Sequence, residues 1–333
     1  MGKRTITLWI LISAVILPLV LLGGVFGLFL FRPVAPPGER LVTVAPGQPF
    51  NQVATRLEKE GVVDSALGLK LLARLQGAAR QVQAGNYEFS SPASPREVLA
   101  RLVSGDVRRL RFTVPEGLTL AEIAAKLEAE GFGRARAFLE LSGDQGFIRG
   151  LDLPGPTLEG YLFPETYTVT AGMPERELVE AMVRELRRRL SPELVAQATG
   201  RGLNVHQLLT LASIIQKEAG NLAEMPLISA VFHNRLKRGI ALQADPTVIY
   251  GVKDFDGNLT RKHLNTPTPY NTYLRRGLPP GPIANPGEDA LRAAAEPAPA
   301  EYLYFVARGD GTHAFSSTLR EHNRAVRKYQ LRR

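Results

Sequence analysis

Apolar residues at helical spacing mark residues 205–220, VHQLLTLASIIQKEAG, as the stretch around which the chain is organised. Leu208, Leu211 and Ile215 fall at i, i+3 and i+7, the spacing of a helix that buries one face. At about 100° per residue, the next position of this stripe is Glu218. The pattern therefore places a carboxyl group where an apolar residue is expected.

Glu218 has two interpretations on helix geometry alone. Gly220 just beyond it is predicted as the helix C-cap, so that the negative end of the helix dipole lies near the carboxyl group. Partial burial and the dipole both disfavour the anion and raise the pKa, as a general acid working near neutral pH requires. The alternative is a structural carboxylate at the rim of the core, paired with a lysine or an arginine.

The N-terminal half contains an internal repeat. Residues 41–61 and 111–131 align without a gap, and each copy predicts a short strand, a turn with glycine and an amphipathic helix. Residues 85–105 predict the same order of elements, with Ser94 as the helix N-cap and Pro95 at the first helical position. Such strand–helix units resemble the LysM domain, which binds N-acetylglucosamine polymers. The alternative is a small α+β domain that acts as a spacer.

The C-terminal half predicts further helices, long loops and two strands. Helices are expected over residues 175–190, 192–200, 226–239 and 288–295, a strand over 302–307, and a final strand and helix from residue 314 onwards. Together with the repeat, these elements predict an α+β fold.

Near the N-terminus, residues 5–31 contain no charged side chain and are long enough to cross a bilayer of about 30 Å as a helix. The run is longer than the apolar region of a cleaved signal peptide, so we predict a retained single-pass transmembrane helix. Lys3 and Arg4 favour a cytoplasmic N-terminus, which places the rest of the chain outside the cytoplasm. An apolar core helix is the alternative. Residues 32–40 follow as a proline-rich spacer.

The chain of 333 residues has no cysteine and a net charge of +9. Disulfides and thiolate metal sites are therefore excluded. The histidines form neither an H-E-x-x-H pattern nor a pair at i, i+4, and glycine motifs for phosphates are absent, so we expect no metal and no cofactor. Arginine clusters such as residues 187–189 are interpreted as solvated helix faces. Because base-stacking motifs are lacking, nucleic acid is not an expected partner.

The loops after residue 240 carry side chains suited to a sugar chain. Tyrosine rings pack on the apolar faces of pyranose rings, while amides and hydroxyls pair with hydroxyl and N-acetyl groups. The candidate binding residues of these loops are Gln243, Asp245, Tyr270, Asn271, Thr272 and Tyr273. Structural turns use the same residue types, so the pattern alone leaves both roles open.

Five motifs follow the apolar N-terminus in order: LEGYLFPETY, LASIIQKEAG, LQADPTVIYG, TPYNTYLRRGLPPGPIANPG and EYLYFVARGDGTHAFSSTLREHN. In this order they resemble the endolytic murein transglycosylase family, also called YceG-like. The resemblance implies an enzyme of the bacterial cytoplasmic membrane that cleaves peptidoglycan glycan strands outside the cytoplasm. It implies a membrane anchor over residues 1–31, a LysM-like region over 41–134 and a catalytic domain over 135–333, with glycan synthases as partners.

The catalytic glutamate of the family is the second acid of a helix motif written A-S-I-x-E-K-E. Here the first acid is replaced by Gln216, and the second is Glu218. The resemblance implies that Glu218 acts as general acid and then as base, cleaving the bond between N-acetylmuramic acid and N-acetylglucosamine to leave a 1,6-anhydro end. Gln216 lies about 160° around the helix from Glu218, so we expect its change to matter little to the chemistry.

Two alternatives remain open at this point. A muramidase-type hydrolase on the same substrate would use a second carboxylate, for which Glu159 and Asp245 are the candidates. The other is a non-catalytic, anchored glycan-binding scaffold. We expect Glu159 and Tyr161, from the LEGYLFPETY motif, to bind or orient the substrate or to support the site structurally.

Overall fold

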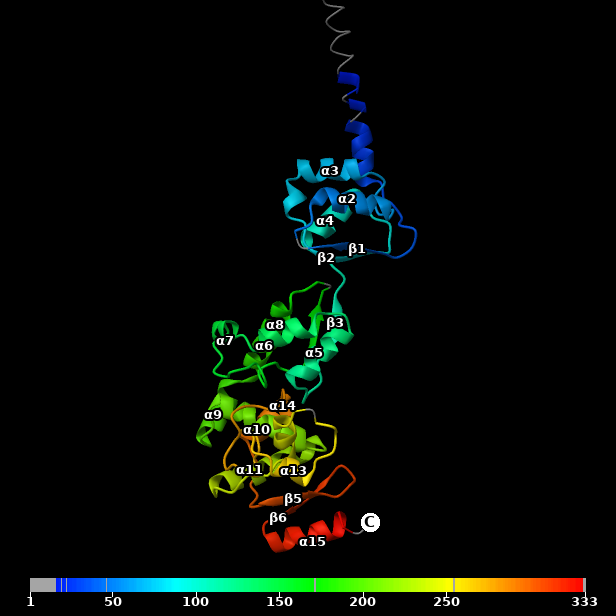
Figure 1. The fold of residues 1–333 in the computed structure, drawn as a ribbon. Coiled ribbons are helices and arrows are strands. Elements are labelled where there is room, and N and C mark those ends of the chain that lie inside the picture. Colours follow the sequence, from blue (N-terminus) through cyan, green and yellow to red (C-terminus); the bar gives the residue numbers. More distant parts are fainter. Residues whose placement is uncertain are drawn as a thin grey trace, which may run out of the picture. The chain divides into compact units, whose positions relative to one another are not determined.

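The computed structural model describes residues 16–18, 20–21, 23–45, 47–170, 172–253 and 255–331. The chain forms two compact units (Figure 1). Unit 1 comprises Met1–Leu110 and Thr168–Met173, and unit 2 comprises Arg111–Tyr167 and Pro174–Arg333. The second copy of the repeat therefore belongs to unit 2, although the sequence grouped it with the first copy.

Unit 1 contains the strand–helix units predicted for residues 41–61 and 85–105, namely β1 (Arg40–Val44) with α2 (Phe50–Lys59) and β2 (Gly85–Phe89) with α4 (Pro95–Ser104). Between them lie two elements without a prediction, α3 (Ala66–Leu75) and a 3₁₀ turn (Ala78–Arg80). β1 and β2 are antiparallel, with Val42 opposite Tyr87. The predicted cap of α4 is confirmed, because Ser94 forms a capping box and Pro95 begins the helix.

The predicted transmembrane segment falls only partly on the described residues, since residues 1–15, 19 and 22 lie outside them. Residues 23–31 are helical, and Phe26 and Leu30 pack against the core of unit 1. Among the described residues, none of the helices combines the length and the apolar character that a bilayer crossing requires.

Unit 2 is a mixed α+β fold, as predicted. Its N-terminal part holds β3 (Leu110–Thr113, which begins at the boundary of the units), α5 (Leu120–Ala129), α6 (Ala135–Ser142), α7 (Gln145–Gly150), β4 (Thr166–Val169, paired with β3 and ending past the same boundary) and α8 (Glu175–Arg189). Its C-terminal part holds α9 (Pro192–Gly200), α10 (Val205–Glu218), a 3₁₀ turn (Leu222–Glu224), α11 (Met225–Lys237), α12 (Asp245–Gly251), α13 (Arg261–Leu264), α14 (Glu288–Ala295), β5 (Tyr304–Ala307), β6 (His313–Ser316) and α15 (Leu319–Tyr329).

Helix α10 lies in the core of unit 2. Every residue from 208 to 215 is buried, whereas the sequence predicted a single buried face. The difference arises because α9, α11, α12 and α14 pack around α10 and cover the remaining faces. The last turn of α10 emerges from this core, so that Glu218 keeps partial solvent exposure.

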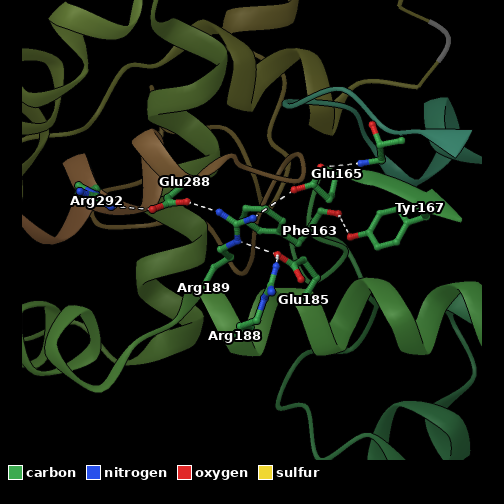
Figure 2. Close-up of polar contacts among 9 residues, drawn as sticks. Phe163, Glu165, Tyr167, Glu185, Arg188, Arg189, Glu288 and Arg292 are labelled. Carbon is green, nitrogen blue, oxygen red and sulfur yellow. Dashed lines mark hydrogen bonds and ion pairs between the residues drawn. The ribbon is translucent and has the colours of Figure 1, made fainter. Parts of the chain in front are cut away.

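Arg189, at the end of α8, joins three segments of unit 2 (Figure 2). Its guanidinium donates to Glu185 over 2.7 Å, to Glu288 of α14 over 2.5 Å and to Glu165 over 3.2 Å. The guanidinium carbon lies 5.1 Å from the centre of the Phe163 ring. An arginine predicted on a solvated face thus belongs to an ion-pair network that holds the LEGYLFPETY segment between α8 and α14.

Candidate functional site

Glu218 is the last residue of α10, a helix that begins with a capping box between Asn204 and Gln207. The predicted glycine C-cap is wrong: the cap is Ala219, in extended backbone. Gly220 serves another purpose, because a Cβ atom there would lie 2.5 Å from the carbonyl oxygen of Gly311. Residue 220 must therefore be glycine for the chain to pack this closely against the turn between β5 and β6. This packing holds the chain in place two residues after Glu218.

Burial, the larger cause, and the negative charge of Asp245 together raise the pKa of Glu218 to about 8. The backbone N–H of Asp245 and the charge of Arg235 act in the opposite direction. The predicted effect of burial on this carboxyl group is confirmed. At neutral pH Glu218 is mostly protonated, and it keeps nearby groups that stabilise the anion once the proton has left.

Arg235 of α11 is buried, with 7% of its surface exposed. Its guanidinium donates to the carbonyl oxygens of Leu303 over 2.7 Å and Leu242 over 2.7 Å. These acceptors fix the cation on the side of the core that faces Glu218. Arg235 was not predicted as a site residue, although Ile228, Phe232 and Arg235 lie at helical spacing on one buried stripe of α11, as Glu218 does on α10.

Two loops from the candidate binding set are joined beside Glu218. The N–H of Gln243 donates to the carbonyl oxygen of Thr272 over 3.1 Å, and the N–H of Ala244 donates to the Thr272 hydroxyl over 3.0 Å. Tyr273 then donates its hydroxyl proton to Oδ1 of Asp245 over 2.6 Å. Gln243 and Asp245 are exposed, and Gln243 has the unusual φ of 51°. This backbone conformation is costly for a residue with a side chain and turns the loop toward solvent.

Comparisons with known proteins give the family of the chain. A description of the YceG-like family matches residues 42–328, most of the chain. The chain belongs to the YceG-like family. The endolytic murein transglycosylase of Bacillus subtilis is 33% identical over 93% of this chain and 91% of the relative. The endolytic murein transglycosylase of Streptococcus pneumoniae strain D39 is 29% identical over 95% of this chain, which spans 64% of that relative.

A solved structure gives the same family. The 2.6 Å crystal structure of a YceG-like protein from Listeria monocytogenes superimposes with a TM-score of 0.60 and 31% identity. The match covers 86% of this chain and 98% of the Listeria chain. The mixed α+β architecture is therefore that of a YceG-like protein.

Other candidate residues of this YceG-like chain have buried side chains. Asn271 donates to the carbonyl oxygens of Leu264 over 3.0 Å and Thr266 over 2.8 Å. The hydroxyl of Thr272 lies 2.8 Å from that of Thr247. Both side chains, Asn271 and Thr272, are at most 1% exposed. They shape the loops around Glu218 from inside.

Glu159 and Tyr161 are buried as well. Glu159 is 4% exposed and accepts hydrogen bonds from the N–H of Leu120 over 3.2 Å, the Tyr250 hydroxyl over 3.1 Å and the Asn285 amide over 3.2 Å. Burial raises its pKa to about 7. These partners attach the start of α5, and with it the second copy of the repeat, to the rest of unit 2.

Tyrosines 161 and 270 flank this buried region. The Tyr161 hydroxyl lies 2.7 Å from Nδ1 of His206, and Tyr161 is 1% exposed. Tyr270 is partly exposed and packs edge-on against Tyr250, with ring centres 4.8 Å apart. Of the two, Tyr270 is the one that reaches the surface.

The last turn of α10 also holds the second repeat copy. Lys217 donates to the carbonyl oxygen of Gly117 over 3.2 Å, and Gln216 accepts from the N–H of Gly287 over 2.9 Å. The side chain of Gln216 also hydrogen bonds with Glu116. Gln216 therefore connects the repeat to the start of α14, on a side of the helix away from the chemistry proposed for Glu218.

In the part of the chain that the structure describes, no group of three or more histidine, cysteine, aspartate or glutamate side chains could hold a metal ion. Asp245 and Tyr273 interact electrostatically with Glu218, and Oε1 of Gln243 accepts a hydrogen bond from Arg235 over 3.3 Å. All three side chains are exposed or partly exposed. The arrangement provides one protonated acid, one neighbouring carboxylate and a polar, tyrosine-bearing rim.

Proposed function

We propose that this chain is a peptidoglycan lytic transglycosylase in which Glu218 is the general acid and then the general base. The observation that carries the proposal is the position of Glu218, which ends the buried helix α10 and still reaches solvent. Burial there raises its pKa to about 8. Membership of the YceG-like family and the names of its curated relatives support the substrate class.

In the first step, protonated Glu218 donates to the oxygen between C1 of N-acetylmuramic acid and C4 of N-acetylglucosamine. The C1–O bond breaks, the leaving sugar departs with a free 4-hydroxyl, and C1 becomes oxocarbenium-like. In the second step, the Glu218 carboxylate accepts the proton of the muramic C6 hydroxyl as O6 bonds to C1. The acid regains its proton, no water is consumed, and the product carries a 1,6-anhydro end.

Two neighbours suit these two halves of the cycle. The charge of Asp245 favours protonated Glu218 before cleavage, whereas the cation of Arg235 favours the carboxylate afterwards. The opposing effects keep the pKa near the working pH, where proton transfer in both directions is efficient. Asp245 thus assists by its charge, without acting as a nucleophile.

We assign substrate contacts to the residues with exposed or partly exposed side chains, Gln243, Asp245, Tyr270 and Tyr273. The buried Glu159, Tyr161, Asn271 and Thr272 are assigned a positioning role, since their polar atoms are engaged within unit 2. Substituting Gln243 with alanine should raise KM for glycan more than it lowers kcat, and an unchanged KM would remove it from the contact set.

Product chemistry separates the three candidate functions. Glycan strands are digested in water enriched in ¹⁸O, and the new ends are analysed by mass spectrometry. A transglycosylase yields 1,6-anhydro ends without ¹⁸O. Reducing ends that carry ¹⁸O would establish a muramidase-type hydrolase, and intact glycan that stays bound to folded protein would favour the scaffold.

We further propose a single-pass anchor over residues 5–31 that leaves the rest of unit 1 and all of unit 2 outside the cytoplasm of a bacterial cell, near glycan synthases. The uncharged run and the preceding Lys3 and Arg4 support this orientation. Because the chain lacks cysteine, Leu274→Cys provides a unique label site on an exposed position of unit 2. A membrane-impermeant maleimide should label it in intact spheroplasts, and labelling only after lysis would reverse the orientation.

A further inference from the structure

Exposed large apolar side chains are concentrated in one region of unit 1. Three of them form a stripe on α3, where Leu67 is 77% exposed, Leu71 46% and Leu75 69%. These positions are i, i+4 and i+8, which at about 100° per residue span about 80° of the helix surface. The opposite face of α3, with Leu69 and Ala73, is buried in the core. Helix α3 therefore has two apolar faces, one of them directed at solvent.

The N-terminal helix lies against the edge of this stripe. A Cβ atom on Gly68 would lie 2.6 Å from Cε1 of Phe29, so glycine permits the ring to touch α3. On the helix wheel Gly68 borders the stripe on the side of Leu75. Val25 and Leu28 of the N-terminal helix are themselves 65% and 75% exposed. The leucine stripe is thus continuous with the exposed apolar surface of the N-terminal helix.

Basic residues border the other side of the stripe. Lys70 and Arg74 follow on the wheel, and together with Leu67, Leu71 and Arg80 they line a hollow of about 830 Å³. Among the described residues, this lining includes neither aspartate nor glutamate. A surface of leucines flanked by cations matches the acyl chains and the phosphate groups of an anionic lipid.

We propose that α3 is an interfacial helix that binds an anionic phospholipid surface, with its leucines in the acyl region and Lys70, Arg74 and Arg80 at the phosphates. Such helices lie in the plane of the membrane with their apolar face about 5–10 Å into the headgroup boundary. In Figure 1, α3 is on the side of unit 1 from which the N-terminal helix leaves, while β1 and β2 are on the opposite side. The proposal is independent of the catalytic step and shares only the membrane setting of the proposed anchor.

The test uses the full-length chain in vesicles of phosphatidylglycerol and phosphatidylcholine. Leu71→Cys carries a fluorophore on the stripe, and Leu41→Cys on β1, 44% exposed, is the matched control in the same unit. Val25→Cys reports on the N-terminal helix. A lipid with a quencher near its headgroup should reduce the emission of the label at position 71 and leave that at position 41 unchanged. Replacing both Lys70 and Arg74 with glutamine, or omitting phosphatidylglycerol, should weaken the quenching at position 71.

Each other outcome overturns the proposal in a distinguishable way. If the label at position 25 is quenched and that at position 71 is as bright as the control, the anchor stands and α3 does not touch the membrane. If neither label is quenched, the anchor fails together with the interfacial helix. If soluble glycan changes the emission at position 71 and lipid does not, the hollow binds sugar.

Discussion

The hydroxyl of Tyr273 donates a 2.6 Å hydrogen bond to Oδ1 of Asp245, the carboxylate whose charge raises the pKa of Glu218. The bond connects the two loops that surround the acid and holds Asp245 in place. The proton affinity of Glu218 is therefore set in part by a residue on another loop.

Replacing Asp245 with asparagine should move the pH profile of cleavage. The change removes a negative charge that raises the pKa of Glu218, so that pKa should fall from about 8. Because the acid must be protonated, activity is lost as pH rises through this pKa, and the alkaline limb should move to lower pH by about one unit. The dependence of kcat/KM on pH measures this shift of the alkaline limb. Asp256→Asn, at an exposed loop position, is the matched control and should leave the limb in place.

Gln216 should be replaceable by glutamate at a pH-dependent cost in stability. Burial raises the pKa of Glu116, the nearby Asp289 raises it further, and the hydrogen bond from Gln216 lowers it. A glutamate at position 216 removes that bond and adds a like charge. The repulsion should lower the free energy of unfolding at pH 8, by only about 1 kcal/mol because Glu116 is exposed and solvent screens its charge. The loss should disappear near pH 4, where the carboxylates are protonated.

Urea unfolding of a double-mutant cycle with Glu116→Gln checks this prediction. The second substitution should restore stability at pH 8 in the Gln216→Glu background. A loss of equal size at both pH values, or one that Glu116→Gln does not relieve, would mean that the effect is steric. Activity should be kept in all three variants, since Gln216 faces away from the proposed chemistry.

Removing Glu159 should destabilise unit 2. Alanine at this position leaves the Leu120 N–H, the Tyr250 hydroxyl and the Asn285 amide without their acceptor, at a cost of about 2–4 kcal/mol. Urea unfolding measures the loss. If Glu159→Ala instead unfolds like the wild type and only weakens glycan binding, the carboxyl group contacts substrate and the positioning role is wrong.

Arg189 and Arg188 are adjacent but should differ in their effect on stability. Arg189 is 28% exposed and pairs with three carboxylates, whereas Arg188 is 70% exposed and pairs with Glu185 alone. Arg189→Ala should lower the free energy of unfolding by about 1–3 kcal/mol, and Arg188→Ala by about 0.5 kcal/mol or less. Equal losses would show that the network in Figure 2 adds nothing beyond a surface pair.

The sequence predicted the parts of this structure that depend on local spacing. The stripe of α10 identified Glu218, and Ser94 with Pro95 marked the start of α4. It did not predict that Gly220 follows the cap of α10 because the chain there approaches Gly311, over ninety residues away, too closely for a side chain. Long-range packing of this kind leaves no periodic signal.

Long-range packing also explains why the motifs could not separate sugar-binding residues from buried, structural ones. Asparagine, threonine and tyrosine suit both sugar binding and buried turns, and only the fold turns Asn271 and Thr272 inward and leaves Gln243 and Asp245 outward. Docking of the second repeat copy through Glu159 and Lys217 depends on contacts across 39 and 100 residues. Arg235 was the exception, since the stripe of α11 already contained it.

Replacing Glu218 with glutamine should make the protein more stable at neutral pH. The pKa of Glu218 is about 8 in the folded state, above its value in the unfolded state. At a pH between these two values, Glu218 is protonated in the folded protein and ionised in the unfolded one. The wild type therefore loses stability as pH rises from about 4.5 to 8, by about 1–3 kcal/mol for a partly exposed group. The variant should lack this slope in thermal unfolding at a series of pH values, and a parallel slope in both proteins would place the pKa of Glu218 in its ordinary range.

The most direct test of the account is glycan cleavage by this same stable variant. Purified full-length wild type and Glu218→Gln are incubated with glycan strands, with Asp256→Asn as the matched control. We predict that the wild type and the control release 1,6-anhydro products and that Glu218→Gln, folded and able to bind glycan, releases none above background. Release of the same products by Glu218→Gln at the wild-type rate would contradict the assignment of Glu218 as the catalytic acid.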